Sequence, residues 1–227
     1  IARRGGRFLS VLPRTHSEDK AFQETLLTGT VEWDEVHKRF DDNGVLVDTV
    51  RASKQSATTS DGFRLLWFHS SRKVELDRQA RAKRVRRGIG ELSSLRLKLC
   101  SPRTRYTEES RVAKAVAKCL AEVGATEWVA VEIRPEEREV FHQDGPGRPG
   151  PNTKYHKEVK KRFDIRFEEN RHAIEEAEKQ DGVFPLVTND RSLSIKDVLL
   201  TYKRQSQIEK HFSQLKTQFE VAPVFLK

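Results

Sequence analysis

Apolar residues recur along this chain with two different periods, which predicts a mixture of helices and strands. Residues 77–99 place apolar side chains three and four positions apart, the spacing of a helix with one buried face. Gly88 and a second glycine two residues later weaken that helix near its middle. A second helix is predicted from Thr107, as its N-cap, to Val123, with Gly124 just past its end. The stripe of the first helix consists of Val85, Ile89, Leu92, Leu95 and Leu99.

Short runs of β-branched and aromatic residues predict strands elsewhere in the chain. In one of these runs Phe163, Ile165 and Phe167 alternate with charged residues, as in a half-buried strand. A short helix is predicted over Asp19–Leu27. Periodicity alone therefore indicates an α/β fold class and leaves the topology open. The predicted strands are residues 7–13, 45–50, 62–69, 128–133 and 162–167.

The last predicted helix, residues 194–220, carries the most specific pattern. Ser194 and Asp197 form a capping box at its start. Four polar side chains fall within an arc of roughly 60° at about 100° per residue, and an apolar set fills the neighbouring arc. The polar set is Tyr202, Gln205, Glu209 and Lys216, and the apolar set is Ile208, Phe212, Leu215 and Phe219. A carboxylate at the rim of a core can hold a metal ion, and a lysine beside it can hold a phosphate.

Composition narrows the class of partner. The 227 residues are enough for one large domain or two small ones, and a net charge of +9 with a pI near 9.6 favours a polyanion. No run of 18 apolar residues occurs, so no membrane span is predicted. Cys100 and Cys119 lack metal-site spacing and are interpreted as reduced thiols. The sequence contains no Gly-rich phosphate loop and no Gly-x-Ser-x-Gly turn, so an NTPase or esterase is poorly supported.

Basic residues concentrate in two further places. Between Arg78 and Lys98 lie eight Lys or Arg residues and one acid, Glu91. Arg81, Arg84 and Arg87 are predicted to line one exposed strip against DNA phosphates, the alternative being a solvated helix face. The second place is the loop 145–151, which contains Gly-Arg-Pro. This loop fits a minor groove, or is a plain Pro/Gly connector.

The final helix resembles the signature of DDE-type insertion-sequence transposases, in the branch whose third catalytic carboxylate lies in Y-x2-R-x3-E-x6-K. Tyr202, Glu209 and Lys216 match that signature at the right spacing. The arginine position holds Gln205, and Arg204 is one residue off. Other segments resemble a subgroup of the same family, most specifically within residues 1–22 and 181–227. They are Arg3–Arg14, Gly145–Tyr155, Asp181–Asp190 and Glu220–Lys227.

The resemblance implies an incomplete ribonuclease H-like core interrupted by a large, mixed, partly β insertion. Residues 1–29 would end that core, residues 30–180 would be the insertion, and residues 181–227 would return to the core. Glu209 would then be a catalytic ligand of Mg²⁺, and Lys216 would contact the phosphate backbone near a transposon end. Tyr202, Arg204 and Gln205 would lie beside the DNA, although the Tyr202 ring can equally serve packing.

In this family the first two catalytic aspartates precede the segment that begins here at Ile1, so the chain would hold one of three carboxylates. The sequence starts with Ile and contains no Met, and it is interpreted as an internal piece of a longer protein or the product of a disrupted gene. Asp190 is the nearest local substitute for a missing carboxylate, whereas a turn-forming Asp after a strand is the commoner role.

Three hypotheses follow for function. The first is a piece of a transposase that cuts and joins double-stranded DNA by Mg²⁺-dependent phosphoryl transfer, inactive by itself. It would be cytoplasmic and associated with a bacterial nucleoid, and a homodimer would pair the transposon ends. The second is a basic protein that binds DNA without cutting it. The third is a remnant that folds poorly. Binding should survive Glu209→Ala and weaken with salt, whereas chemistry should require both Glu209 and Mg²⁺.

Overall fold

The chain forms two compact units, each built from helices and antiparallel strands. The computed structural model describes residues 6–29, 31–101, 103–151 and 153–205. Unit 1 consists of residues 1–77 and 178–227, and unit 2 consists of residues 78–177. The predicted α/β class is confirmed at this level, with one antiparallel sheet in each unit.

Unit 1 is organised around a five-stranded sheet with the strand order β1-β7-β4-β3-β2, in which every neighbouring pair is antiparallel. Central strand β4 is buried from Leu65 to Phe68 without alternation, because both faces of the sheet are covered. The strands are β1 (Leu9–Val11), β2 (Trp33–Phe40), β3 (Leu46–Thr58), β4 (Arg64–Ser70) and β7 (Val183–Thr188).

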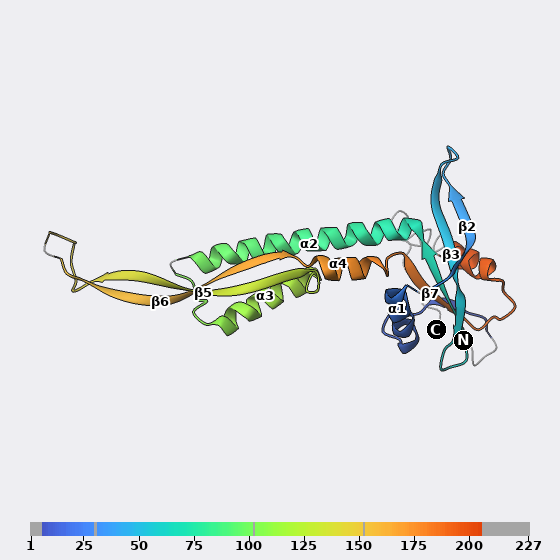
Figure 1. Cartoon of the computed structure of the whole chain (residues 1–227), viewed down its shortest axis with the longest axis horizontal. Coiled ribbons are helices and arrows are strands. Elements are labelled where there is room, and N and C mark those ends of the chain that lie inside the picture. The colour runs from blue at the N-terminus through green and yellow to red at the C-terminus, as the bar shows by residue number, and fades with distance from the viewer. Residues whose placement is uncertain (1–5, 30, 102, 152, 206–227) are drawn as a thin grey trace, which may run out of the picture. The chain divides into compact units, whose positions relative to one another are not determined.

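Two helices cover the two faces of this sheet (Figure 1). On one face α1 (Ser17–Thr28) packs Phe22 on Trp67, with the ring centroids 4.1 Å apart. The Trp67 Nε1–H also donates to Asp19 Oδ1 at 3.1 Å, which satisfies both buried polar groups. On the other face the helical residues 195–205 bury Val198 and Leu199 in a cluster with residues of β3, β4 and β7.

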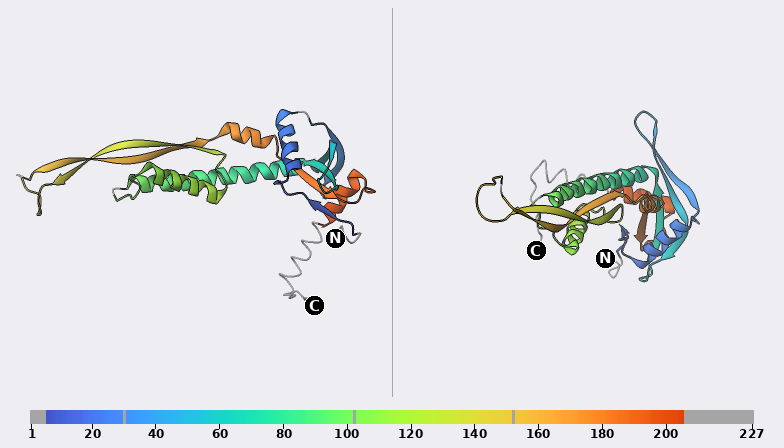
Figure 2. Two further views of the ribbon diagram at one scale, coloured as in Figure 1. Left: turned by 90° about the horizontal axis from the view of Figure 1, so that it is seen from below. Right: turned by 60° about the vertical axis from the view of Figure 1, so that its left-hand side comes forward.

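Unit 2 combines helices with a long two-stranded ribbon (Figure 2). Helix α2 begins at Ser71 in unit 1 and continues through unit 2. Its stripe packs with the apolar face of α3 and with the inner ends of β5 and β6. The elements are α2 (Ser71–Cys100), α3 (Glu109–Val123), β5 (Val129–Gln143), β6 (Tyr155–Glu169) and α4 (Arg171–Glu178).

The glycine predicted to weaken α2 instead marks a close approach. A Cβ on Gly88 would stand 3.1 Å from the Ala125 Cβ and 3.3 Å from the Leu120 Cδ2, so the small residue lets the helix pack closely. The end of α3 at Gly124 is confirmed, with φ 65° and its N–H bonded to the Ala121 carbonyl. The Thr107 N-cap is wrong, because Glu108 stands at that position and its side chain makes no capping bond.

The compact units do not follow the segments expected from the resemblance. The expected insertion, residues 30–180, contributes β2, β3 and β4 to the same sheet as β1 and β7. Strand β2 and helix α4 were not predicted, and β5 and β6 are each much longer than the predicted strands. A five-stranded antiparallel sheet is the observed arrangement in unit 1.

Candidate nucleic-acid interface

The final helix begins as the sequence predicts. The Ser194 hydroxyl donates to Asp197 Oδ2 at 2.6 Å, and the Asp197 N–H donates to Ser194 Oγ at 3.1 Å, which confirms the capping box. Tyr202 is half-buried, with its ring centroid 6.0 Å from that of Phe184 on β7. The packing alternative for Tyr202 therefore accounts for its ring.

Of the other predicted residues of this helix, two lie within the described residues and two lie outside them. Arg204 and Gln205 are both exposed, so each can reach a ligand in solvent. Glu209 and Lys216 lie outside the described residues.

Removing the capping hydroxyl tests whether this helix start is as firm as its geometry indicates. Ser194→Ala is expected to lower the unfolding free energy of unit 1 by about 1 kcal/mol, because an orphan helix N–H loses its acceptor. Urea denaturation followed by far-ultraviolet circular dichroism measures the change. Ser194→Thr keeps a hydroxyl and should retain most of the stability. An equal loss in both variants would contradict the capping role.

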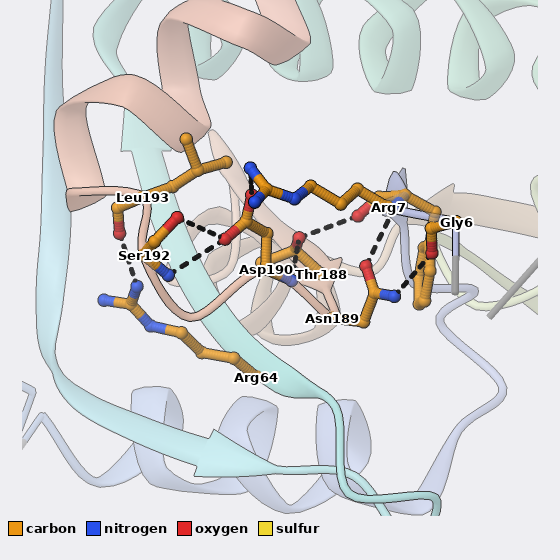
Figure 3. A network of polar contacts seen from close by, with 9 residues as sticks. Gly6, Arg7, Arg64, Thr188, Asn189, Asp190, Ser192 and Leu193 are labelled. Carbon is orange, nitrogen blue, oxygen red and sulfur yellow. Dashed lines mark hydrogen bonds and ion pairs between the residues drawn. The ribbon is translucent and has the colours of Figure 1, made fainter.

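Asp190, the local candidate for a metal ligand, is committed to a turn (Figure 3). Its Oδ1 accepts the Ser192 N–H at 2.9 Å and the Ser192 hydroxyl at 2.6 Å, and its Oδ2 pairs with Arg7 at 3.0 Å. The Ser192 hydrogen bonds, helped by the charge of Arg7, hold the pKa of Asp190 below its ordinary value. The turn interpretation is confirmed.

Neighbours of Asp190 extend this network to the edge of the sheet (Figure 3). The Asn189 amide accepts from the Phe8 N–H at 2.8 Å and donates to the Gly6 carbonyl at 2.8 Å, which continues the β1–β7 pairing through a side chain. Arg64 of β4 donates to the Leu193 carbonyl at 2.8 Å, just before the final helix. These contacts fix where that helix begins relative to the sheet.

A second polar cluster, not predicted from the sequence, ties the final helix to β3. Asp48 is 6% exposed and accepts the Ser70 hydroxyl at 2.8 Å and the Arg72 N–H at 3.2 Å, at the start of α2. Lys203 of the final helix reaches Asp48 Oδ2 at 3.4 Å. Burial and the positive charges of Lys203 and Lys196 lower the pKa of nearby His37.

Magnesium would require several oxygen ligands in one place. Within residues 6–29, 31–101, 103–151 and 153–205, no group of three His, Cys, Asp or Glu side chains is arranged to hold a metal ion. The oxygens of Asp190 are already engaged with Arg7 and Ser192. The described residues therefore form no such group by themselves, and Glu209 lies outside them.

The basic face of α2 is present but differs from the predicted strip. Arg81 is 6% exposed, so its assignment to an exposed strip is wrong. It lies four residues before Val85 and so falls on the buried stripe. Arg84 is exposed and its guanidinium stands 5.9 Å from the centroid of the Trp128 ring, while Arg87 is exposed as predicted.

Two exposed residues complete this surface and were missed. Lys83 and Arg86 point away from the buried stripe, and their positions opposite it were readable from helical spacing. From Arg78 to Gly90 the sequence contains no Asp or Glu. We name Lys83, Arg84, Arg86 and Arg87 the basic strip.

The remaining predictions concern thiols and membranes. Both cysteines are free, and burial raises the pKa of the Cys119 thiol. Among the parts of the chain that are described, no helix is long and apolar enough to cross a membrane. Comparison with protein-family models, with curated proteins and with solved structures finds no match to this chain.

Proposed function

We propose that this chain binds duplex DNA through the basic strip, as part of a DDE-type transposase. The observation that carries the proposal is an exposed helical surface of four cations with no carboxylate from Arg78 to Gly90. Such a surface neutralises phosphates and releases condensed counterions, which is the main source of sequence-independent affinity for DNA. The net charge of +9 acts in the same direction at longer range.

The transposase part of the proposal is supported by the signature in the final helix. Tyr202 packs against Phe184 of the sheet, and in the sequence Glu209 and Lys216 follow at intervals of seven residues. Glu209 is assigned as one ligand of a Mg²⁺ ion, and Lys216 as a phosphate contact. Bound Mg²⁺ would activate the attacking hydroxyl and stabilise the leaving oxygen. The ribonuclease H-like core belongs to the same proposal.

Fluorescence anisotropy with a labelled 30-base-pair duplex tests DNA binding directly. Affinity is expected to fall steeply between 50 and 200 mM salt. Arg86→Gln with Arg87→Gln should weaken binding about tenfold and reduce the salt slope by about 2, because each phosphate contact contributes about one unit. The variant would lose two phosphate contacts and so bind more weakly. Its fold should not change, because both side chains are exposed.

The matched control removes the same charge from α3. Lys114→Gln with Lys118→Gln alters two exposed lysines outside the basic strip. This variant should keep the wild-type salt slope to within about half a unit. Equal losses in the two double variants would sink the assignment to the basic strip, and a wild-type chain that binds no duplex would sink the function itself.

A second candidate, a basic protein that binds DNA without catalysis, is favoured by the commitment of Asp190 to its turn. Both candidates predict that Glu209→Ala binds DNA normally. The DNA sequence before the Ile1 codon distinguishes the two candidates. The transposase assignment requires an in-frame continuation there that encodes two aspartates. A stop codon or frameshift there would leave only the binding function.

A further inference from the structure

The β5–β6 ribbon continues well beyond the core of unit 2. The last pair that contributes a buried side chain is Pro135↔Phe163, and eight more pairs follow, out to Gln143↔Tyr155. At about 3.4 Å per residue this outer ribbon is roughly 27 Å long. It extends past the ends of the helices of unit 2 (Figure 2). An isolated two-stranded ribbon is marginally stable in water, so a partner surface would stabilise it.

One face of the outer ribbon combines apolar and basic side chains. Directly paired residues share a face, and every second pair returns to it. Phe141 is 62% exposed, Tyr155 52% and Val159 52%, and all three lie on the face that further inward enters the core. Lys157, opposite Phe141, pairs with Glu139. On the opposite face His156 lies against Asp144 and His142 against Glu158.

The connecting loop is basic and small in cross-section. From Gly145 to Lys157 the sequence contains three cations, Arg148, Lys154 and Lys157, and no Asp or Glu. Arg148 and Lys154 are exposed, and neither has an ion-pair partner among the described residues. Between Gly145 and Pro151 every residue except Arg148 is glycine or proline. Glycine and proline add little side-chain bulk, which suits a tip that enters the minor groove of B-DNA, about 6 Å wide.

The loop is held in shape by its own hydrogen bonds. The Thr153 N–H donates to the Gly150 carbonyl at 3.1 Å, and the Gly150 N–H donates to Thr153 Oγ1 at 2.7 Å. Gln143 Nε2 donates to the Gly147 carbonyl at 3.2 Å. No described side chain lies within 4 Å of where a Cβ would stand at Gly147, whose φ is 133°. These hydrogen bonds order the loop before it meets a ligand, so less conformational entropy is lost on binding.

We propose that the β5–β6 ribbon is a DNA-binding arm whose tip places Arg148 in a minor groove, with Lys154 and Lys157 on the flanking phosphates. The inference rests on the proposed function, because both require duplex DNA as the ligand. It assigns a second contact, separate from the basic strip. A cation in a narrow minor groove meets an enhanced negative potential, and prolines at a ribbon tip can wedge between base steps. Two aromatic rings beside the tip supply apolar surface for the sugars.

The test measures the affinity of the full chain for an A·T-rich 30-base-pair duplex at fixed salt. Arg148→Ala is expected to weaken binding about tenfold. Arg148→Lys should recover part of that loss, because lysine keeps the charge without the planar fork. The matched control is Arg171→Ala, which removes an exposed arginine from α4 and should change affinity by less than about twofold. Circular dichroism establishes that all variants keep the wild-type fold.

Dimethyl sulfate footprinting shows which groove of the DNA the protein covers, and a change in the protein's overall charge does not alter that pattern. Adenine N3 faces the minor groove and guanine N7 the major groove. Wild-type protein should protect adenine N3, and Arg148→Ala should lose that protection.

If the wild type binds and the basic-strip variant weakens binding while Arg148→Ala does not, the arm is overturned and the proposed function stands. A wild type that binds no duplex overturns both. If Phe141→Ser instead dissociates a dimer in sedimentation while Arg148→Ala leaves DNA affinity unchanged, the ribbon is a protein interface.

Discussion

Gly182→Ala is expected to lower the unfolding free energy of unit 1 by about 4 kcal/mol. Gly182 precedes β7 with φ 79°, a conformation that costs an alanine about 1–2 kcal/mol. A Cβ there would also stand 2.5 Å from the Val74 Cγ2 and 2.7 Å from the Ser70 carbonyl oxygen. The added methyl group therefore meets both a side chain and the backbone.

The backbone at this contact has little freedom to move away. The Ser70 N–H donates to the Gly182 carbonyl at 3.0 Å, and the Gly182 N–H donates to Asp77 Oδ2 at 2.9 Å. Relief of the clash would lengthen one of these bonds or shift the start of α2. The steric term therefore adds to the conformational term.

Gly62→Ala separates the two terms. Gly62 has φ 81°, and no neighbouring atom lies within 4 Å of its Cβ position among the described residues. It should lose only the conformational part, about 1 kcal/mol. Urea unfolding followed by tryptophan fluorescence in a Trp128→Phe background reports on unit 1 through Trp33 and Trp67. Equal losses at Gly62 and Gly182 would show that the Ser70 contact carries no cost.

Asp48→Ala is expected to remove about 3 kcal/mol of unfolding free energy. The change leaves the Ser70 hydroxyl and the Arg72 N–H without their acceptor at the start of α2. It also frees Lys203 and so loosens the final helix. Asp34→Ala is the control, because Asp34 is exposed and its ion pair, 3.8 Å from Lys54 Nζ, lies on the surface. Surface pairs of that kind contribute little, and an equal loss in both variants would contradict the role of Asp48.

The contribution of Asp48 to the free energy of unfolding is expected to depend on pH in a definite direction. Burial opposes its ionisation, but the hydrogen bonds from Ser70 and Arg72 and the charge of Lys203 outweigh burial, so its pKa is lowered in the folded state. A lowered carboxyl pKa stabilises the fold above the ordinary value of about 3.9, and this contribution is lost as pH falls toward the folded value. The stability difference between wild type and Asp48→Asn should therefore shrink below about pH 4. A difference that grows on acidification would show the opposite sign.

Local patterns were sufficient where one helix face or one turn decided the outcome. The stripe from Val85 to Leu99 predicted most of α2, and the capping box at Ser194 predicted the start of the final helix. Gly124 marked the end of α3 because a left-handed C-cap is a local requirement. The Asp190 turn likewise depends on a hydrogen bond only two residues along the chain.

Other features depended on contacts far apart in the sequence. Strand β2 is largely polar, so its place at the sheet edge follows from pairing with β3 and not from its own residues. Arg81 reads as one more basic residue, and only the packing of α2 shows that it is buried. The outer ribbon has no core to impose an apolar alternation, so the sequence indicated only the inner part of β5 and β6.

The sequence by itself determined the positions of the main helices, the basic balance, the capping box, the Gly-Arg-Pro loop and the spacing of Tyr202, Glu209 and Lys216. Each depends on residue identity or on spacing within one element. Only the tertiary structure decided that β7 pairs with both β1 and β4, that Lys203 reaches Asp48, and that Arg148 stands at the tip of a long ribbon. Strand pairing and polar side-chain contacts join residues separated by as much as 183 positions. Their free energy depends on the whole packed unit, which no local window contains.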